Sequence, residues 1–241
     1  MVDEHSYTYT SRKLIHITHR LRLKETLNLV SNKINSNVNK IADFGGGSGF
    51  IGDKVADRCN NINSQYVFDI VHPLNERNPN RRMYSPHIKT NYRTFNLNTD
   101  EINTNLIDSS FLIICSETIE HVGDPFACIE KLINSAAICK CELYISFPIE
   151  RGIKGFIKFL VKLLIGRYFR KRTIKSLILQ ILWFLGFIKN IRKDKDLYPD
   201  HDGFEDIKLS KFIKTYCFKR NLKMEPSIGL FTRHFYIKPN N

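Results

Sequence analysis

The sequence lacks the features of a secreted or membrane-spanning protein. Its six cysteines show no framework spacing, and Cys139 and Cys141 stand too close together for a redox CxxC pair or a zinc knuckle, so we expect buried structural thiols. The first residues are polar and acidic, and we therefore expect no signal peptide. The uncharged stretch 176–188 is shorter than the roughly 20 residues of a spanning helix. These absences favour a reducing, cytoplasmic compartment.

Negative charge is missing from one long segment. Residues 151–193 contain twelve Lys and Arg and no Asp or Glu. The formal net charge of +13 therefore belongs almost wholly to this segment, and the remainder of the chain is nearly neutral. A nucleic-acid enzyme more often spreads basic residues around its active-site cleft, although a single basic arm remains an alternative.

Short apolar runs separated by helix-length gaps indicate a parallel sheet covered by helices. A chain of 241 residues, 42% of them hydrophobic, suits one domain better than two. We predict an α/β protein with a doubly wound, Rossmann-like sheet, and an amphipathic helix before it. The expected strands are 41–44, 66–71, 92–97, 111–115 and 143–147; the expected sections of the single domain 1–241 are an N-terminal helical cap (1–39), a cofactor-binding core (40–150), an amphipathic helical insertion (151–196) and a C-terminal helix with strands (197–241).

A glycine-rich turn, within residues 41–52, directly follows the first expected strand. Glycines at that place allow positive φ angles and a close approach of the backbone to a ligand. Asp69 ends the next strand, where a carboxylate can accept hydrogen bonds from both hydroxyls of a ribose. The combination predicts a nucleotide-sized pocket.

The glycines alone leave two cofactor classes open, because residues 47–52 also spell the GxGxxG pattern of dinucleotide-binding enzymes. Asp43, an acid before the glycines, would repel a pyrophosphate, whereas it suits the amino group of a methionine. With this acid, residues 43–49 resemble the DxGxGxG motif of class I S-adenosylmethionine-dependent methyltransferases. The resemblance implies S-adenosylmethionine as cofactor. On this interpretation the cofactor-binding residues are Asp43, Gly45, Gly47, Gly49, Asp69, Asn96 near the adenine and Ser116 at the end of the fourth strand.

Two further segments extend the resemblance. Residues 111–125 are similar to the fourth strand and following turn of this family, and residues 143–148 to its fifth strand with a terminal proline. A weaker similarity covers 200–222. Asn96 departs from the pattern, since the family often has an acid there. Among its subfamilies, the chain resembles ubiquinone-biosynthesis and surface-glycan methyltransferases.

Methyl transfer requires alignment of the acceptor with the methyl group and, for some acceptors, removal of a proton. His121, just past the fourth strand, is a candidate general base because an unperturbed histidine titrates near neutral pH. We count Glu120 beside it as a second catalytic candidate. The alternative is that His121 only caps or packs the turn.

A metal is a further hypothesis. Glu117, Glu120 and His121 stand at i, i+3 and i+4, which share one face if the segment is helical, and two carboxylates with an imidazole suit a divalent ion. The pattern resembles ubiquinone-biosynthesis O-methyltransferases and small-RNA 3′-end 2′-O-methyltransferases. The second resemblance implies His201 as another ligand. Many relatives keep Glu-His without a metal, so both possibilities stay open.

The basic segment separates substrate classes. Lys154, Lys158 and Lys162 recur every fourth residue in an otherwise apolar stretch, which favours helices lying on a bilayer with anionic headgroups. A lid packed within the protein is the alternative. A similar insertion occurs beside the substrate entrance in quinone and surface-glycan methyltransferases.

We therefore expect an S-adenosylmethionine-dependent methyltransferase, peripheral at a cytoplasmic membrane surface, that O-methylates a hydroxyl on a lipid-linked sugar, glycan or quinone-like acceptor. A metal-assisted RNA 2′-O-methyltransferase is the main alternative, although aromatics interleaved with arginine are sparse in 151–193. An NAD-dependent oxidoreductase would need a catalytic Tyr/Lys pair that we do not find. A non-catalytic scaffold would be expected to lose the acids and glycines of the cofactor motif.

Overall fold

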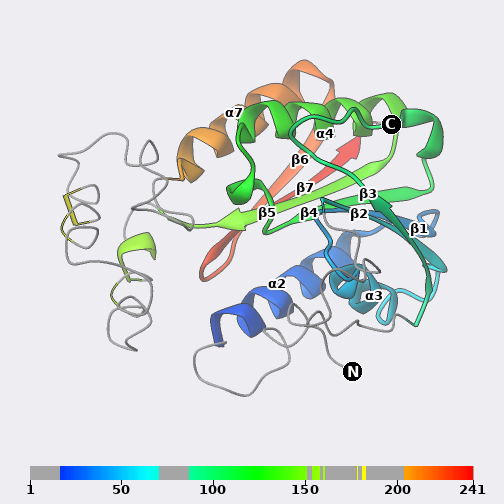
Figure 1. Ribbon diagram of the computed structural model, residues 1–241, viewed down its shortest axis with the longest axis horizontal. Helices are drawn as coiled ribbons and strands as arrows, with labels where there is room; N and C mark the ends of the chain where they lie inside the picture. The colour runs from blue at the N-terminus through cyan, green and yellow to red at the C-terminus, as the bar shows by residue number, and fades with distance from the viewer. Residues whose placement is uncertain are drawn as a thin grey trace.

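The computed structural model describes residues 17–70, 87–150 and 204–240, together with positions 154–157, 160, 178, 181 and 182. The described strands form one seven-stranded sheet in the order β3-β2-β1-β4-β5-β7-β6 (Figure 1). The first five strands run parallel, and β7 lies antiparallel between β5 and β6. The strands are β1 (Lys40–Phe44), β2 (Ser64–Asp69), β3 (Lys89–Thr94), β4 (Phe111–Ser116), β5 (Glu142–Pro148), β6 (Leu222–Ile228) and β7 (Thr232–Pro239).

Helices cover both faces of this sheet. In Figure 1, α2 (Ile17–Lys33) and α3 (Phe50–Ala56) lie on one face, and α4 (Pro125–Cys139) and α7 (Asp206–Lys219) lie on the other. The doubly wound, Rossmann-like architecture expected from the alternating apolar runs is thus confirmed.

All five expected strands are present, but the second and the third begin and end earlier than their patterns indicated, by two and three residues. β3 lies at the edge of the sheet and pairs only with β2, whose last residue Asp69 is opposite Thr94. Beyond Thr94 the chain turns, because the Asp100 carboxylate accepts a hydrogen bond of 2.8 Å from the backbone N–H of Asn96. Phe95, Asn96 and Leu97 therefore belong to the segment that follows the strand.

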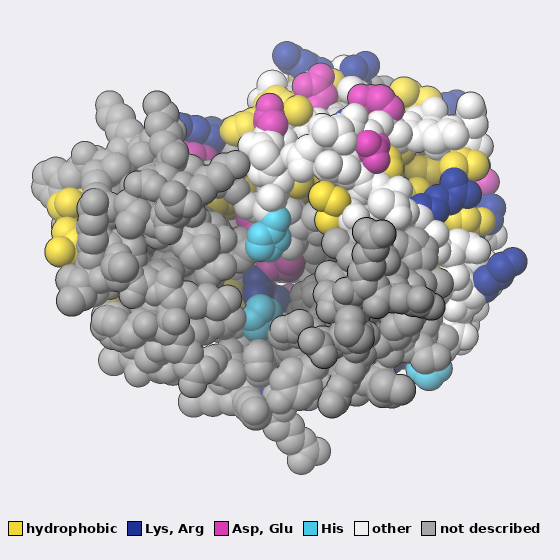
Figure 2. Space-filling model, in the orientation of Figure 1, with side chains coloured by type: hydrophobic (Ala, Val, Ile, Leu, Met, Phe, Trp, Pro, Cys, Tyr) yellow, Lys and Arg dark blue, Asp and Glu magenta, His cyan; other side chains and the backbone are white. Residues whose placement is uncertain are grey.

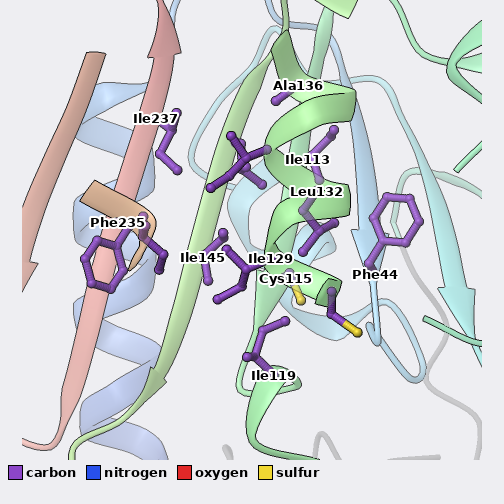
Figure 3. Close-up of a cluster of buried hydrophobic side chains, with 14 of the residues drawn as sticks. Phe44, Ile113, Cys115, Ile119, Ile129, Leu132, Ala136, Ile145, Phe235 and Ile237 are labelled. Atoms are coloured by element: carbon purple, nitrogen blue, oxygen red, sulfur yellow. The ribbon is translucent and has the colours of Figure 1, made fainter. Parts of the chain in front are cut away.

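The core is divided between the two faces because successive strand residues point to opposite sides. Ile113 and Ile145 pack on the α4 and α7 side, whereas Leu112 and Ile114 pack on the α2 and α3 side. Figure 3 shows the first cluster, in which strand residues face Ile129 of α4. Strands β4 and β5 are buried along their whole length, as expected for central parallel strands.

The Asp-Pro pair after the fourth strand starts α4. The Asp124 carboxylate accepts hydrogen bonds from the backbone N–H groups of Phe126 and Ala127, and Pro125 occupies the first turn, where no N–H is needed. A left-handed Lys140 ends the helix. These signals set the length of the connection between β4 and α4, which contains His121.

The cysteines are free thiols, and all but the half-buried Cys139 are buried. Burial raises the pKa of Cys115 well above its ordinary value, as expected for an inert, packed thiol.

Within the described part of the chain, no helix combines the length and apolar character needed to cross a bilayer. Most of the expected insertion 151–196, and His201, lie outside the described residues.

Candidate functional site

A cavity of about 440 Å³ opens where β1, β2, β3 and β4 end. Open α/β sheets bind their ligands at this edge, and the volume lies in the usual range for small-molecule sites. Figure 2 shows this face of the molecule with a central hollow, where histidine, acidic and basic side chains gather. The cavity is lined by Gly45, Phe68, Asp69, Ile70, Phe95, Asn96, Leu97, Asn98, Glu117, Thr118, His121 and Val122.

The glycine-rich turn after β1 reaches the cavity through Gly45, whereas Asp43, Gly47 and Gly49 lie behind its lining. Gly45, Gly47 and Gly49 all have positive φ, the region that favours glycine. A Cβ on Gly45 would lie 2.2 Å from Cγ2 of Thr118, so only glycine allows the turn to approach the segment after β4 this closely. Thr118, which the sequence analysis did not single out, is therefore part of the site.

The two acids predicted from the motif lie on either side of this turn. Asp43 is only 1% exposed, and its Oδ2 has no hydrogen-bond partner among the described residues. Burial raises the pKa of Asp43 from its ordinary value of 3.8 to about 7, and the negative charge of Asp69 adds to the rise. Asp69 Oδ2 accepts a hydrogen bond of 2.8 Å from the backbone N–H of Gly47. The end of β2 thus holds the glycine turn in place beside a buried carboxyl group.

Asn96 lines the cavity as expected, but its side chain also organises its own turn. Its Oδ1 accepts a hydrogen bond of 3.0 Å from the backbone N–H of Asn98. The neighbouring wall is apolar: Phe68 and Phe95 pack edge to face at 5.7 Å, and Ile70 is 60% exposed beside them. This apolar wall suits a flat heterocycle, and the sequence pattern alone did not reveal it.

Ser116 lies apart from the cavity lining. It is buried at the end of β4, and its hydroxyl forms a hydrogen bond of 2.8 Å with the hydroxyl of Ser146 on β5. In this arrangement Ser116 joins two strands, and its expected contact with the cofactor stays a prediction.

The segment after β4 does not place its three candidate ligands on one helical face. Glu117 has a φ of 57°, in the left-handed region, and the 3₁₀ turn η3 (Ile119–His121) begins only two residues later. Glu120 is buried, whereas His121 is exposed and lines the cavity. The helical spacing assumed for the metal hypothesis is therefore wrong for Glu117.

Glu117 instead pairs with a residue from the other end of the chain. Its Oε2 accepts a hydrogen bond from the guanidinium of Arg22 on α2, and both side chains are nearly buried. The second terminal nitrogen of Arg22 lies 2.8 Å from Nδ1 of His19. Arg22 thus brings a positive charge to the cavity rim, and nothing in the amphipathic pattern of α2 distinguishes it from Arg20.

The described residues contain one group whose donor atoms all lie within 4.8 Å of one another, formed by Asp53, Asp57 and His87. Glu117, Glu120 and His121 do not form such a group, and His201 lies outside the described part. The metal site stays a prediction.

Comparison with solved structures gives the architecture a precedent. The plantazolicin methyltransferase BpumL, solved with a monoazolic desmethylPZN analogue and S-adenosylhomocysteine, matches with a TM-score of 0.57 and 10% identity over 98% of this chain and 90% of its own. The methyltransferase domain of bacterial CtHen1 matches with a TM-score of 0.55 and 11% identity, over 91% and 98%. An O-methyltransferase family protein from Burkholderia thailandensis matches with a TM-score of 0.51 and 12% identity over 99% of this chain, which spans 63% of that protein's length.

The fold is that of the class I methyltransferases. At these identities the likeness concerns the fold alone. Proteins that share one fold can act on many different substrates, so the fold does not identify the methyl acceptor. No protein-family model matches the chain. No curated protein matches it either.

Proposed function

We propose that the protein is an S-adenosylmethionine-dependent methyltransferase. The observation that carries the proposal is the pair of carboxylates, Asp43 and Asp69, around a glycine turn with positive φ angles at the edge of a ligand-sized cavity. This arrangement provides hydrogen-bond acceptors for a ribose and for an ammonium group.

The lining residues fit the cofactor part by part. Asp69 would accept hydrogen bonds from the ribose hydroxyls, and the apolar wall of Phe68 and Phe95 would hold the adenine. The unpartnered buried oxygen of Asp43, together with the Arg22–Glu117 pair, would meet the charged groups of the methionine. When bound, the cofactor supplies an electrophilic methyl group on a sulfonium sulfur.

A dinucleotide fits this turn less well. In dinucleotide-binding enzymes the backbone N–H groups of the turn face a pyrophosphate. Here the N–H of Gly47 donates to Asp69, and Asp43 lies beneath the same turn. In this arrangement the Gly47 N–H is therefore not available to a pyrophosphate.

For the acceptor we propose a hydroxyl on a lipid-linked sugar, glycan or quinone-like ring. His121 is exposed at the cavity and has the chemistry to take the hydroxyl proton, with Glu120 buried next to it. The basic segment 151–193 would contact the anionic surface in which such an acceptor resides.

The pairing of Glu117 with Arg22 competes with coordination of a metal ion by Glu117, Glu120 and His121. A metal-assisted reaction on RNA would require this ion pair to open. We therefore favour proton removal by His121 over the RNA 2′-O-methyltransferase alternative.

The test is calorimetric titration of the protein with S-adenosylhomocysteine and, separately, with NADH, before and after EDTA treatment. We expect saturable binding of S-adenosylhomocysteine, no binding of NADH and no effect of EDTA. Binding of NADH alone would overturn the proposal. A loss of turnover in EDTA that Mg²⁺ or Mn²⁺ restores would favour the metal-assisted alternative.

A further inference from the structure

The turn between β6 and β7 lies at the same edge of the sheet as the cavity. Strand β7 runs antiparallel to β5, so Thr232 at its start is opposite Pro148 at the carboxyl end of β5. The hairpin turn 229–231 therefore projects from the edge at which the parallel strands end (Figure 1). Two apolar side chains are exposed here: Ile228, the last residue of β6, is 57% accessible, and Leu230 in the turn is 50% accessible.

Hydrogen bonds fix the backbone of this turn to the rest of the protein. The N–H of Gly229 donates to the carbonyl of Thr232 at 2.9 Å, and the N–H of Leu230 donates to the Glu25 carboxylate of α2 at 2.9 Å. A Cβ on Gly229 would lie 2.0 Å from the same carboxylate. The backbone N–H groups of Gly229 and Leu230 thus donate hydrogen bonds within the protein, whereas the side chains of Ile228 and Leu230 are accessible.

The start of the basic segment adjoins the turn. The ammonium group of Lys154 donates a hydrogen bond of 2.8 Å to the carbonyl of Gly229. The helical residues 154–157 carry two more accessible apolar side chains, Phe156 at 41% and Ile157 at 49%. The two segments joined by this hydrogen bond thus expose isoleucine, leucine and phenylalanine side chains. In the sequence, residues 151–193 carry twelve positive charges and no negative one.

We infer that the β6–β7 turn is a membrane-docking element, in which Ile228 and Leu230 enter the interface of a bilayer with anionic headgroups. The charge of 151–193 is complementary to such a surface, and exposed apolar side chains next to basic ones are the usual combination for interfacial binding. The inference rests on the proposed function, because the role of the docking element would be to bring a lipid-linked acceptor to the cavity at the same edge. Glu25 connects the turn to α2, the helix that also carries Arg22 to the cavity.

The test is flotation of the full-length protein with vesicles of phosphatidylcholine alone or with about one third phosphatidylglycerol. The variant is Ile228→Ser combined with Leu230→Ser. The matched control is Ile138→Ser combined with Phe218→Ser, two exposed apolar residues at the ends of α4 and α7. Both control residues precede strands that start at the opposite edge of the sheet.

We expect the wild type and the control to bind anionic vesicles, and the turn variant to bind about tenfold or more weakly, because two aliphatic side chains lose their burial in lipid. Equal binding of the turn variant and the wild type would overturn the inference. So would failure of the wild type to bind anionic vesicles, or an effect of the turn variant on self-association in gel filtration without any effect on flotation.

S-adenosylhomocysteine titration of the same three proteins separates the two proposals. Vesicle binding without cofactor binding would leave the docking element standing and overturn the proposed function. Cofactor binding without vesicle binding would leave the proposed function standing and overturn the docking element.

Discussion

Asp69 at the end of β2 accepts a 2.8 Å hydrogen bond from the backbone N–H of Gly47 in the turn after β1. A second bond joins the same segments, from the N–H of Gly45 to the carbonyl of Phe68 at 2.7 Å. One carboxylate can therefore hold the glycine turn and also accept hydrogen bonds from a ribose. Cofactor affinity should depend on it twice, through the shape of the turn and through direct contact.

Replacement of Asp69 is the most direct test of this double role. We expect Asp69→Ala to weaken S-adenosylhomocysteine binding about tenfold to a hundredfold, because hydrogen bonds to a charged group are lost. Asp69→Asn keeps an acceptor for Gly47 and should lose less. Calorimetry is the measurement, with Asp57→Ala on the exposed end of α3 as control. Unchanged affinity in Asp69→Ala would exclude the ribose contact.

Asp43 should make stability depend on pH. Its pKa is raised from 3.8 to about 7, so between these values the folded protein holds a proton that the unfolded chain releases. This group's contribution to the free energy of unfolding therefore falls as pH rises from about 4 to about 7, by up to about 4 kcal/mol. The variant Asp43→Asn removes this pH-dependent contribution, because asparagine does not titrate.

Urea unfolding of the ligand-free protein at pH 5 and pH 8 measures this effect. The wild type should lose more stability between the two pH values than Asp43→Asn does. Equal losses in both proteins would show that Asp43 titrates normally.

The Arg22–Glu117 pair should couple the N-terminal helix to the cavity. Either Arg22→Met or Glu117→Gln leaves a nearly buried polar partner without its counterpart and should destabilise the protein by about 2–3 kcal/mol. The double variant should lose less than the sum of the two. A double-mutant cycle in urea measures this coupling, and strictly additive losses would contradict the pairing.

His121 should affect turnover far more than cofactor binding. As a general base it contributes about a hundredfold or more to the rate, so His121→Gln should lower kcat by that factor and change S-adenosylhomocysteine affinity little. His87→Gln is the control, because His87 is also exposed but does not line the cavity. The assay uses labelled S-adenosylmethionine and a hydroxylated lipid-linked acceptor. Full activity in His121→Gln would assign the histidine a packing role.

Local patterns predicted the centre of this fold well. Residues 41–44, 111–115 and 143–147 are mostly apolar because central strands are buried on both faces, and each range lies in a strand of the structure. The third strand was predicted too late in the sequence. An edge strand needs fewer apolar residues, and the apolar Phe95 and Leu97 lie in the segment that follows it. Asp43, the glycines and Asp69 were found because their chemistry follows directly from positions at strand ends.

The segment after β4 shows where local pattern fails. The spacing of Glu117, Glu120 and His121 indicated a shared helical face, but the left-handed Glu117 turns its carboxylate toward Arg22. Such a backbone conformation depends on what surrounds the residue, and the partner lies 95 positions away in the sequence.

The sequence by itself determined the order of strands and helices and the acids beside the glycine turn, because burial periodicity and strand-end chemistry are local properties. Tertiary structure decided which distant side chains meet: Arg22 with Glu117, Ser116 with Ser146, and Glu25 with the β6–β7 turn. These contacts arise when the sheet and its two helical layers pack together, since only packing brings a residue of α2 within hydrogen-bond distance of the ends of β4 and β6.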